Sequence, residues 1–345
     1  MKRDFLSIAD WSSDELRRIL DLSAKMKKNP RAYIRVLEGR SVAMIFEKQS
    51  LRTHVTFDVA IHQLGGHAIY LTQADISLGK RESIHDVAKN LERWVAGIVV
   101  RTFAHAGLVE LARRARVPVI NALTDLEHPC QAVADFLTLE EHLGSLKGKR
   151  LAFVGDGNNV CHSLMLLAAN LGMDFVAVTP RGYLPGEEVV RIATAIAAKH
   201  GSVVELSHTP QEGVRNADAV YTDVWASMGQ ETEKEERAKI FRDFQVNASL
   251  MRCAKPQALF MHCLPAHRGE EVTDEVMDAA PSVVFDQAEN RMHTEKAILY
   301  TLLRNQSREE NRTDRHRRKL AHPDRTAGNH RRTNRKRAAH RPKRR

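Results

Sequence analysis

Short apolar runs alternate with amphipathic stretches along most of the chain, and this alternation predicts a parallel α/β fold. Short uninterrupted apolar runs favour buried strands, whereas apolar residues three and four positions apart favour helices. In the first half, strands are expected at 41–46, 67–71, 97–100 and 118–121, and helices at 55–64, 84–95, 108–115 and 130–143. An earlier helix is expected to begin at Ser12-Ser13-Asp14-Glu15, which has the pattern of a capping box.

The second half repeats the alternation. Strands are expected at 150–154, 175–178, 203–206, 219–222, 259–262 and 282–285, and a last apolar helix at 294–303. Because crossovers between parallel strands are right-handed, two doubly wound sheets side by side are the economical architecture. We therefore expect a first domain at 1–145, a second at 146–288, a C-terminal helical segment at 289–305 and a tail at 306–345.

The charge of the chain is concentrated in this tail. The 345 residues carry a net charge of +10, but residues 306–345 alone contain sixteen basic and four acidic residues, so the rest is close to neutral. The tail has almost no apolar residues and cannot bury enough surface to offset its ordering entropy, so disorder is expected there. Such a tail could bind a nucleic acid or another acidic surface.

The sequence predicts a cytoplasmic protein. No apolar run approaches the roughly 20 residues that span a bilayer. No signal-peptide core follows the early Lys2 and Arg3. The four cysteines are Cys130, Cys161, Cys253 and Cys263, and they show neither metal-ligand spacing nor a dense disulfide framework, which fits reduced thiols.

Polar clusters follow several predicted strands of the first half, where ligands bind in open parallel sheets. Ser50-Leu51-Arg52-Thr53 brings backbone N–H groups, hydroxyls and a guanidinium to a helix start, which indicates an anion site. Arg101 could add a second fixed positive charge, and His128 and Gln131 could donate hydrogen bonds to a carbonyl beside a phosphate. Taken singly, these features also fit a helix cap, a surface ion pair and structural loop residues.

Further clusters follow strands of the second half. Gly155-Asp156-Gly157-Asn158-Asn159 lacks the third small residue of a dinucleotide fingerprint, and its asparagines suit an amino-acid carboxylate or ammonium group. Asp223 could hold a substrate amine at the start of the loop 223–229, which alternatively is a turn with a packed Trp225. His262-Cys263-Leu264-Pro265 follows the strand at 259–262.

In this order and separation, the motifs resemble those of the aspartate/ornithine carbamoyltransferase family over nearly all of residues 1–305. The segments that carry the resemblance are Phe46-Glu47-Lys48 with Ser50 to Thr53, His128-Pro129-Cys130-Gln131, Asp156 to Asn159, Asp223 to Gly229, and His262 to Gly269. The cysteine of the last motif and the Ser-Met-Gly loop at 227–229 are absent from aspartate-using members, so both point to a basic amino acid.

The resemblance implies a first domain for carbamoyl phosphate, a second for ornithine, and a C-terminal helix that packs on the first. The residues implied for carbamoyl phosphate are Ser50, Leu51, Arg52, Thr53, Arg101, His128, Gln131, Cys263, Leu264 and Arg291. Those implied for ornithine are Asn159, Asp223, Ser227 and Met228. Arg52, Arg101, His128, Asp223 and Cys263 would be catalytic. Family members are trimers with sites between chains, and Ser77 could reach a neighbouring subunit. Neither a metal nor a cofactor is expected.

We therefore expect transfer of the carbamoyl group of carbamoyl phosphate to the δ-amine of L-ornithine, giving L-citrulline and phosphate in arginine metabolism. Leu51 and His54 depart from the usual Ser-Thr-Arg-Thr-Arg motif and remove one hydroxyl and one permanent charge. One alternative is another amine, such as putrescine or an acylated ornithine. An alternative of a different class is a non-catalytic binder of nucleic acid or an acidic surface through the tail.

Overall fold

The structure is a computed structural model. It describes residues 2–76, 79, 81–226 and 231–321, and for residue 231 and residues 305–321 it describes the backbone alone. The chain divides into a compact unit, Met1–Leu303, and a second unit that begins at Arg304. All of the candidate site residues lie in the first unit.

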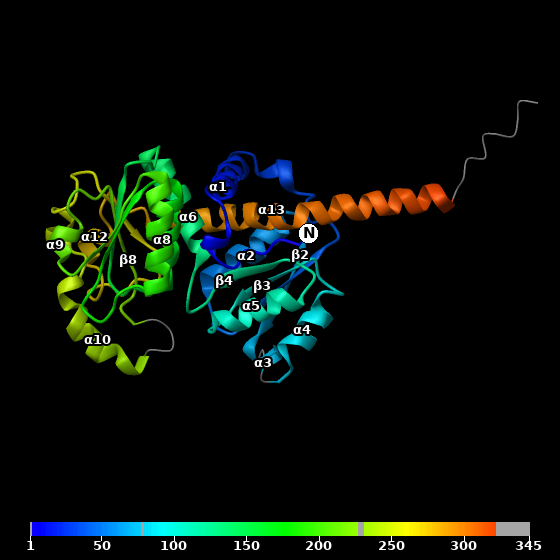
Figure 1. The fold of residues 1–345 in the computed structure, drawn as a ribbon, viewed down its shortest axis with the longest axis horizontal. Helices are drawn as coiled ribbons and strands as arrows, with labels where there is room; N and C mark the ends of the chain where they lie inside the picture. Colours follow the sequence, from blue (N-terminus) through cyan, green and yellow to red (C-terminus); the bar gives the residue numbers. More distant parts are fainter. Residues whose placement is uncertain (1, 77–78, 80, 227–230, 322–345) are drawn as a thin grey trace, which may run out of the picture. The chain divides into compact units, whose positions relative to one another are not determined.

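The first sheet is parallel, with the strand order β2-β1-β3-β4 (Figure 1). Its strands are β1 (Ser41–Phe46), β2 (His67–Thr72), β3 (Gly97–Arg101) and β4 (Val119–Leu123). The helices of this half are η1 (Ile8–Asp10), α1 (Ser13–Lys28), η2 (Pro30–Tyr33), α2 (Leu51–Gln63), α3 (Gln73–Ile76), α4 (Ile84–Leu91), α5 (His105–Arg114) and α6 (Pro129–Leu143). β3 and β4 are buried along their whole length, as their continuous apolar runs predict for strands covered on both faces.

The second sheet is also parallel, with the order β7-β6-β5-β8-β9. Its strands are β5 (Arg150–Val154), β6 (Asp174–Val178), β7 (Val204–Ser207), β8 (Ala219–Thr222) and β9 (Leu259–His262). The helices of this half are α7 (Asn159–Leu171), α8 (Glu187–His200), α9 (Pro210–Gly213), η3 (Glu231–Glu233), α10 (Lys234–Phe241), η4 (Arg242–Phe244), α11 (Ala248–Met251), α12 (Asp274–Met277) and α13 (Val284–Ala321). The prediction of two parallel α/β sheets is confirmed.

Local capping signals place the helix starts. Ser12 is the N-cap of α1 and forms the predicted capping box with Glu15. The helix expected from residue 55 begins earlier, at Leu51, because the Ser50 hydroxyl caps it by accepting the Thr53 N–H. This shift matters for the site, because it places Arg52 and Thr53 in the first turn of α2.

The strand predicted at 282–285 is wrong. Ser282 forms only an isolated bridge with Phe260, and α13 begins at Val284. The apolar run that suggested a strand is not buried throughout, because Phe285 is 70% exposed. The good helix formers that follow, including Gln287 and Glu289, extend the segment as a helix instead.

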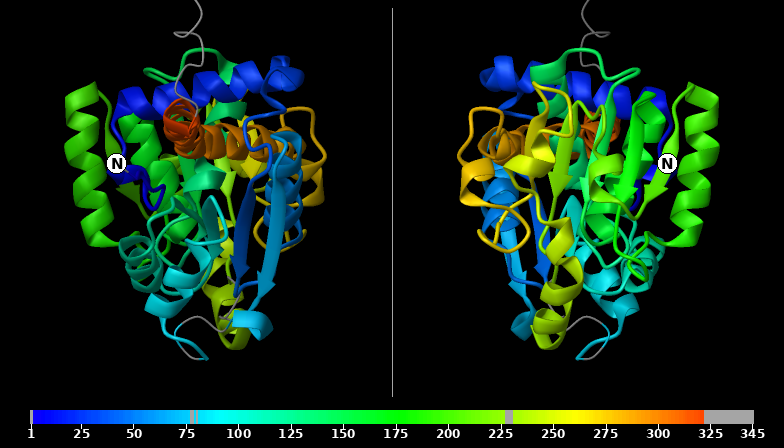
Figure 2. Two further views of the ribbon diagram at one scale, coloured as in Figure 1. Left: turned by 90° about the vertical axis from the view of Figure 1, so that its right-hand side faces the viewer. Right: turned by 90° about the vertical axis from the view of Figure 1, so that its left-hand side faces the viewer.

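The C-terminal helix returns to the first sheet, as expected. Lys296 Nζ donates to Gln63 Oε1 at 2.9 Å, and Arg40 Nη1 donates to the Leu303 carbonyl at 3.0 Å. Lys27 of α1 donates to Asn290 Oδ1 at 2.8 Å, and Figure 2 shows α1 extended across the view while α13 is seen nearly end-on, so the two helices cross.

The expected end of this helix near residue 303 is wrong, since α13 is helical through Ala321. The helix therefore extends into the first part of the tail, residues 306–321. Glutamate, arginine, glutamine and lysine dominate this stretch and are good helix formers, and the first proline after it is Pro323. Residues 322–345 lie outside the described part of the chain.

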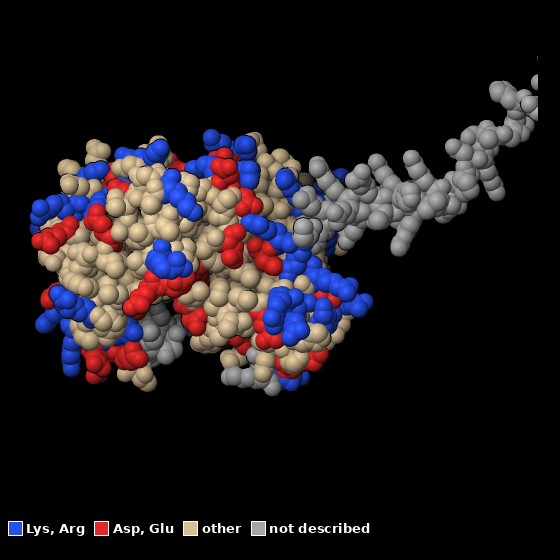
Figure 3. Space-filling model, in the orientation of Figure 1, with Lys and Arg blue, Asp and Glu red and all other residues tan. Residues whose placement is uncertain are grey.

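The surface of the described residues carries charges of both signs. On the face seen in Figure 3, lysine and arginine side chains are interspersed with aspartate and glutamate, which agrees with the near-neutral charge of the chain before the tail. Among the helices that the structure describes, none combines the length and the apolar character needed to cross a membrane.

Candidate active site

A cavity of about 370 Å³ collects most of the predicted site residues. Its walls come from segments that follow the carboxyl ends of strands in both sheets. The cavity is lined by Lys48, Gln49, Ser50, Leu51, Arg52, Arg101, Leu123, His128, Gln131, Asn159, Val160, Asp223, Val224, Ala226, Cys263, Leu264, Pro265, His267 and Arg291. Arg52, Arg101 and His128 therefore share one cavity with Asp223 and Cys263. Ser77, Ser227 and Met228 lie outside the described residues.

Three guanidinium groups meet on the side of the cavity formed by α2, β3 and α13. Thr53 lies fully buried behind them, and its Oγ1 accepts hydrogen bonds from Arg291 Nη2 at 2.6 Å and from Arg101 Nη1 at 3.3 Å. Burial, and after it the nearby Arg291, lower the pKa of Arg101 to about 10. The group is still a cation at neutral pH. Burial and Arg291 also lower the pKa of Arg52.

Such a cluster is electrostatically unfavourable when it is empty, because its cations repel one another in a partly dry environment. An anion relieves that repulsion. The first turn of α2 adds unpaired backbone N–H groups and the positive end of a helix dipole. This wall is therefore suited to an anion with several acceptor oxygens, such as a phosphate group, and its fixed charges would stabilise negative charge that develops there.

The two departures from the usual motif have different surroundings. Leu51 lines the cavity and is 75% exposed. The His54 ring stacks on Tyr70 with ring centroids 3.7 Å apart, so it belongs to an aromatic cluster with Phe46.

Leu51→Thr should lower the KM for carbamoyl phosphate about twofold to fivefold, because a hydroxyl in the first turn of α2 adds one hydrogen-bond donor toward the anion. His54→Arg should lower this KM less, because the loss of the ring stack on Tyr70 offsets the gain of a permanent charge. Steady-state kinetics at fixed ionic strength measure both. A Leu51→Thr enzyme with an unchanged or higher KM would contradict a phosphate seated at this helix start.

His128 and Gln131 lie on the next wall, where β4 passes into α6. The His128 backbone N–H donates to Ser163 Oγ at 2.9 Å, which fixes the loop against α7. Burial, with Arg291 and Arg101 nearby, holds the pKa of His128 well below its ordinary value. The ring is therefore neutral at pH 7 and can donate a hydrogen bond without carrying a charge. His128 Nδ1 and Gln131 Oε1 are buried atoms with no hydrogen-bond partner among the described residues.

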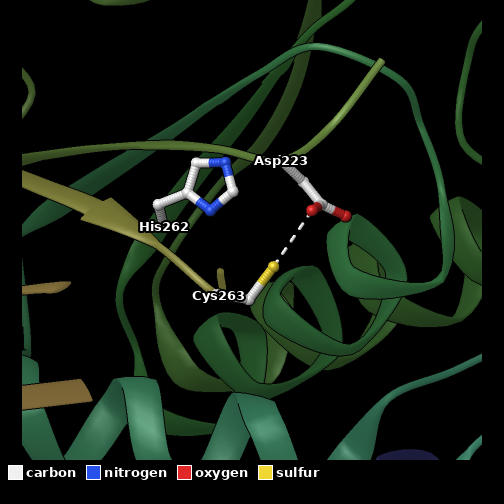
Figure 4. Close-up of side chains that lie close together, drawn as sticks. All are labelled: Asp223, His262 and Cys263. Atoms are coloured by element: carbon white, nitrogen blue, oxygen red, sulfur yellow. Dashed lines mark hydrogen bonds between the residues drawn. The ribbon is translucent and has the colours of Figure 1, made fainter. Parts of the chain in front are cut away.

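Asp223 and Cys263, which follow β8 and β9, form another part of the cavity wall (Figure 4). Cys263 Sγ donates to Asp223 Oδ1 at 3.0 Å, and Asn158 Nδ2 donates to Asp223 Oδ2 at 2.8 Å. Burial and the adjacent Asp223 raise the pKa of Cys263 well above its ordinary value. The thiol is therefore protonated and acts as a hydrogen-bond donor, not as a nucleophile. The aspartate offers a carboxylate to a cationic or amine group in the cavity.

His262 belongs to the scaffold of this wall. Its Nδ1 accepts the Leu264 N–H at 2.8 Å, so the proton is on Nε2, which faces Glu271 Oε1 at 3.2 Å. Asp223, His262 and Cys263 lie close enough together to be considered as metal ligands, but both ring nitrogens of His262 are engaged. The contact with His262 also holds Leu264 at φ 59°, a backbone conformation that leucine rarely adopts.

The glycine-containing turn after β5 has a packing role. A Cβ atom at Gly157 would lie 2.2 Å from the backbone nitrogen of Pro185, so only glycine fits there. Asn158 caps α7, with its Oδ1 accepting the N–H groups of Val160 and Cys161. This cap orients the Asn158 amide nitrogen toward Asp223, and it agrees with the interpretation that the turn is not a dinucleotide site.

Comparison with known proteins decides the family. The model of the aspartate/ornithine carbamoyltransferase carbamoyl-P binding domain matches residues 3–141, and that of the Asp/Orn binding domain matches residues 147–302. The chain belongs to the aspartate/ornithine carbamoyltransferase family. Together the two matches cover all of the cavity residues named above.

Individual relatives in the family are similar over most of their length. An ornithine carbamoyltransferase of Pyrococcus horikoshii is 52% identical over 307 residues, covering 87% of this chain and 96% of the relative. The anabolic ornithine carbamoyltransferase of Pyrococcus furiosus is 52% identical over 303 residues, covering 86% and 95%. A solved structure of ornithine carbamoyltransferase from P. furiosus matches with a TM-score of 0.85 at 51% identity, covering 88% of this chain and 97% of that chain.

Around this carbamoyltransferase site, the structure adds buried carboxylates that the sequence interpretation missed. Glu127 accepts the Ser163 hydroxyl at 3.0 Å behind His128, and Asp135 accepts Gln131 Nε2 at 2.7 Å. Glu295 is fully buried, 3.6 Å from Arg291 Nη2. Asp135 and Glu295 each stand four positions after a cavity residue on the same helix. The sequence signal that could have found these two residues was a carboxylate four positions after a cavity residue on the same helix.

Glu295→Gln should stabilise this carbamoyltransferase fold at pH 8 by about 3 kcal/mol more than at pH 5. Burial raises the pKa of Glu295 from 4.5 to about 8, against the opposing effect of Arg291. Between these two values the folded state binds more protons than the unfolded state, so the wild-type free energy of unfolding falls as the pH rises. Glutamine does not titrate and escapes that loss.

Urea unfolding at pH 5 and pH 8, at matched chain concentration, measures the effect. Glu38→Gln is the control, because Glu38 is exposed. A difference between Glu295→Gln and wild type that is the same at both pH values would show that Glu295 does not titrate in this window.

Proposed function

We propose that the chain catalyses transfer of the carbamoyl group from carbamoyl phosphate to the δ-amine of L-ornithine, giving L-citrulline and phosphate. The observation that carries this proposal is the one cavity that Arg52, Arg101 and Arg291 line together with Asp223, Cys263 and the neutral His128. The names of the relatives at 52% identity support ornithine as the amino acid.

The geometry supports a division of labour in the transfer. The arginines and the start of α2 would bind the phosphate, while His128 would donate a hydrogen bond to the carbamoyl oxygen and polarise the carbon toward attack. Asp223 and the Cys263 thiol would position the δ-amine as it loses a proton. A C–N bond then forms, the C–O bond to phosphate breaks, and the departing phosphate can accept the proton lost by the amine.

The remaining site residues have supporting parts in this proposal. Ser50, Leu51 and Thr53 would hold or frame the phosphate, Gln131 and Leu264 would contact the carbamoyl group, and Asn159 would bind the ornithine backbone. Asn159 Nδ2 already donates to the Thr124 carbonyl at 2.6 Å, so its Oδ1 would face the substrate ammonium. Ser227 and Met228 would hold ornithine, and Ser77 would contribute from a neighbouring subunit.

We also propose the wider setting that the family suggests. The enzyme would work in the cytoplasm and would assemble as a trimer or a multiple of trimers. It would work in the anabolic direction, which the name of the P. furiosus relative gives for that protein. The carbamoyl-phosphate domain would span 1–145 and the ornithine domain 146–288, with the helix from 289 to 305 joined to the first.

The proposal is tested by citrulline formation from purified protein with carbamoyl phosphate and L-ornithine. Putrescine and N-acetyl-L-ornithine, assayed in parallel, test the alternative amines, and a product from either but not from ornithine would replace the substrate proposed here. A chain ending at residue 305 tests the binder hypothesis. Nucleic-acid binding that disappears with the tail, in a protein that makes no citrulline, would overturn the enzymatic proposal.

A further inference from the structure

Asp135 is a fully buried carboxylate at the centre of a hydrogen-bond network behind the cavity. Its Oδ1 accepts Gln131 Nε2 at 2.7 Å and Gln287 Nε2 at 2.8 Å, and its Oδ2 accepts the Tyr221 hydroxyl at 3.1 Å. The three donors come from three elements, α6, α13 and β8. One side chain thus joins a helix of the first half to a strand of the second.

The first consequence concerns the orientation of the Gln131 amide. Burial raises the pKa of Asp135 to about 7, so near neutral pH the carboxyl group carries a proton part of the time. Oδ1 already accepts two amide NH₂ groups, so that proton sits on Oδ2, beside the Tyr221 hydroxyl. Oδ1 is therefore an acceptor in either state, the NH₂ group of Gln131 must face it, and a flipped amide would bring two acceptors together. Gln131 lines the cavity, and its Oε1 is buried without a partner among the described residues. The cavity is therefore offered a hydrogen-bond acceptor, which suits the NH₂ group of a carbamoyl moiety and not its oxygen.

The second consequence concerns how the segment that carries Gln131 is linked to the segment that carries Cys263. Gln287 Oε1 accepts the backbone N–H of His262 at 3.0 Å, while its Nε2 donates to Asp135. His262 directly precedes Cys263, which contacts Asp223. A continuous chain of hydrogen bonds therefore runs from Gln131, through Asp135 and Gln287, to the backbone that carries Cys263.

We propose that Asp135 is a positioning residue for carbamoyl transfer: it fixes the Gln131 amide with its oxygen toward the carbamoyl group and ties this wall to the His262-Cys263 segment through Gln287. Asp135 touches no substrate. The inference rests on the proposed function, because it assigns a carbamoyl group to the space beside Gln131. Small displacements of positioned groups lower rates strongly, so the loss of Asp135 should be visible in kinetics.

Asp135→Leu removes both acceptor oxygens at similar side-chain volume and should lower kcat/KM for carbamoyl phosphate about tenfold or more. The Ki for inorganic phosphate should stay within about twofold, because the arginine wall is untouched. Asp135→Asn should restore activity to within about threefold of wild type. Its Oδ1 can accept both glutamines, which share one oxygen in the structure, and its Nδ2 can donate to the Tyr221 oxygen.

Tyr221→Phe is the matched control. It removes one hydrogen bond from the same buried carboxylate without touching Gln131 or Gln287, so stability should fall while kcat/KM stays within about threefold. If Tyr221→Phe lost as much activity as Asp135→Leu, the effect of Asp135 would be structural and the positioning role would be refuted. A double-mutant cycle adds a second criterion: in a Gln131→Met background the effect of Asp135→Leu on kcat/KM should shrink to the part that the Gln287 link carries, about fivefold or less. If Asp135→Leu lowered kcat/KM by the same factor with and without Gln131→Met, the proposal would be overturned.

If Asp135→Leu does not fold, Gln287→Leu decides the question. It leaves Asp135 and Gln131 bonded but cuts the link to His262, and it should lower kcat about fivefold with little change in the KM for carbamoyl phosphate. An unchanged kcat would overturn the link. These outcomes are distinct from a failure of the proposed function, because in that case the wild-type protein itself would form no citrulline.

Discussion

Arg52→Ala should lower kcat/KM for carbamoyl phosphate by about two to three orders of magnitude and leave the fold intact. Arg52 stands in the first turn of α2 and lines the cavity beside Arg291. Removing one preorganised donor to charge that develops in a transition state typically costs about 2.7 to 4 kcal/mol. The side chain is partly exposed, so its truncation opens no void in the core.

The experiment compares Arg52→Ala with Arg113→Ala, which removes an equal charge from an exposed position in the last turn of α5. Citrulline formation gives kcat and KM, and the midpoint of thermal unfolding reports on the fold. Arg113→Ala should match wild type. The phosphate wall would be wrongly assigned if Arg52→Ala kept wild-type kinetics, or if the two variants lost activity equally.

The strands and the site segments were predictable for the same physical reason. In an open parallel sheet the strands carry continuous apolar runs, and the polar residues that follow them gather at one edge. Arg101 at the end of β3 and Asp223 after β8 could therefore be placed at these sheet edges from the sequence alone. Their meeting in one cavity required the relative position of the two sheets, which local pattern does not contain.

Other features depended on contacts that sequence spacing does not reveal. Arg291 entered the prediction only through the family resemblance, because it lies inside a helix and follows no strand. Asp135 resembled an ordinary helix residue until Tyr221 and Gln287 were found to converge on it. The strand expected at 282–285 failed because a short apolar run is ambiguous between strand and helix, and length is the main discriminator.

The surroundings of Arg101 and Arg291 suggest how the protein tolerates a cluster of buried cations. Arg101 and Arg291 repel each other, yet both donate to the neutral hydroxyl of Thr53, and Glu295 is the nearby carboxylate. Burial raises the pKa of Glu295 to about 8, so near neutral pH it supplies only part of a negative charge. The site therefore keeps most of its positive charge for an incoming phosphate.

Asp223→Asn should lower kcat/KM for L-ornithine by about two to three orders of magnitude, since an amide cannot pair with a cationic or proton-losing amine as a carboxylate does. Losing one partner of a desolvated charge pair typically costs about 2 to 5 kcal/mol. The Ki for inorganic phosphate should change little, because the substitution leaves Arg52 and Arg101 in place.

The structure also predicts a modest stability loss for this variant, which separates it from a pure charge effect. Asn158 Oδ1 is fixed as the cap of α7, so the Asn158 amide cannot rotate, and its Nδ2 would lose its acceptor when the Asp223 oxygen becomes an amino group. That loss is worth about 1 kcal/mol. Asp243→Asn, at an exposed position in the same half of the chain, is the control and should behave as wild type. If Asp223→Asn kept its ornithine kinetics, the amine would have to bind on another wall, and the assignment of Cys263 as its neighbour would fail with it.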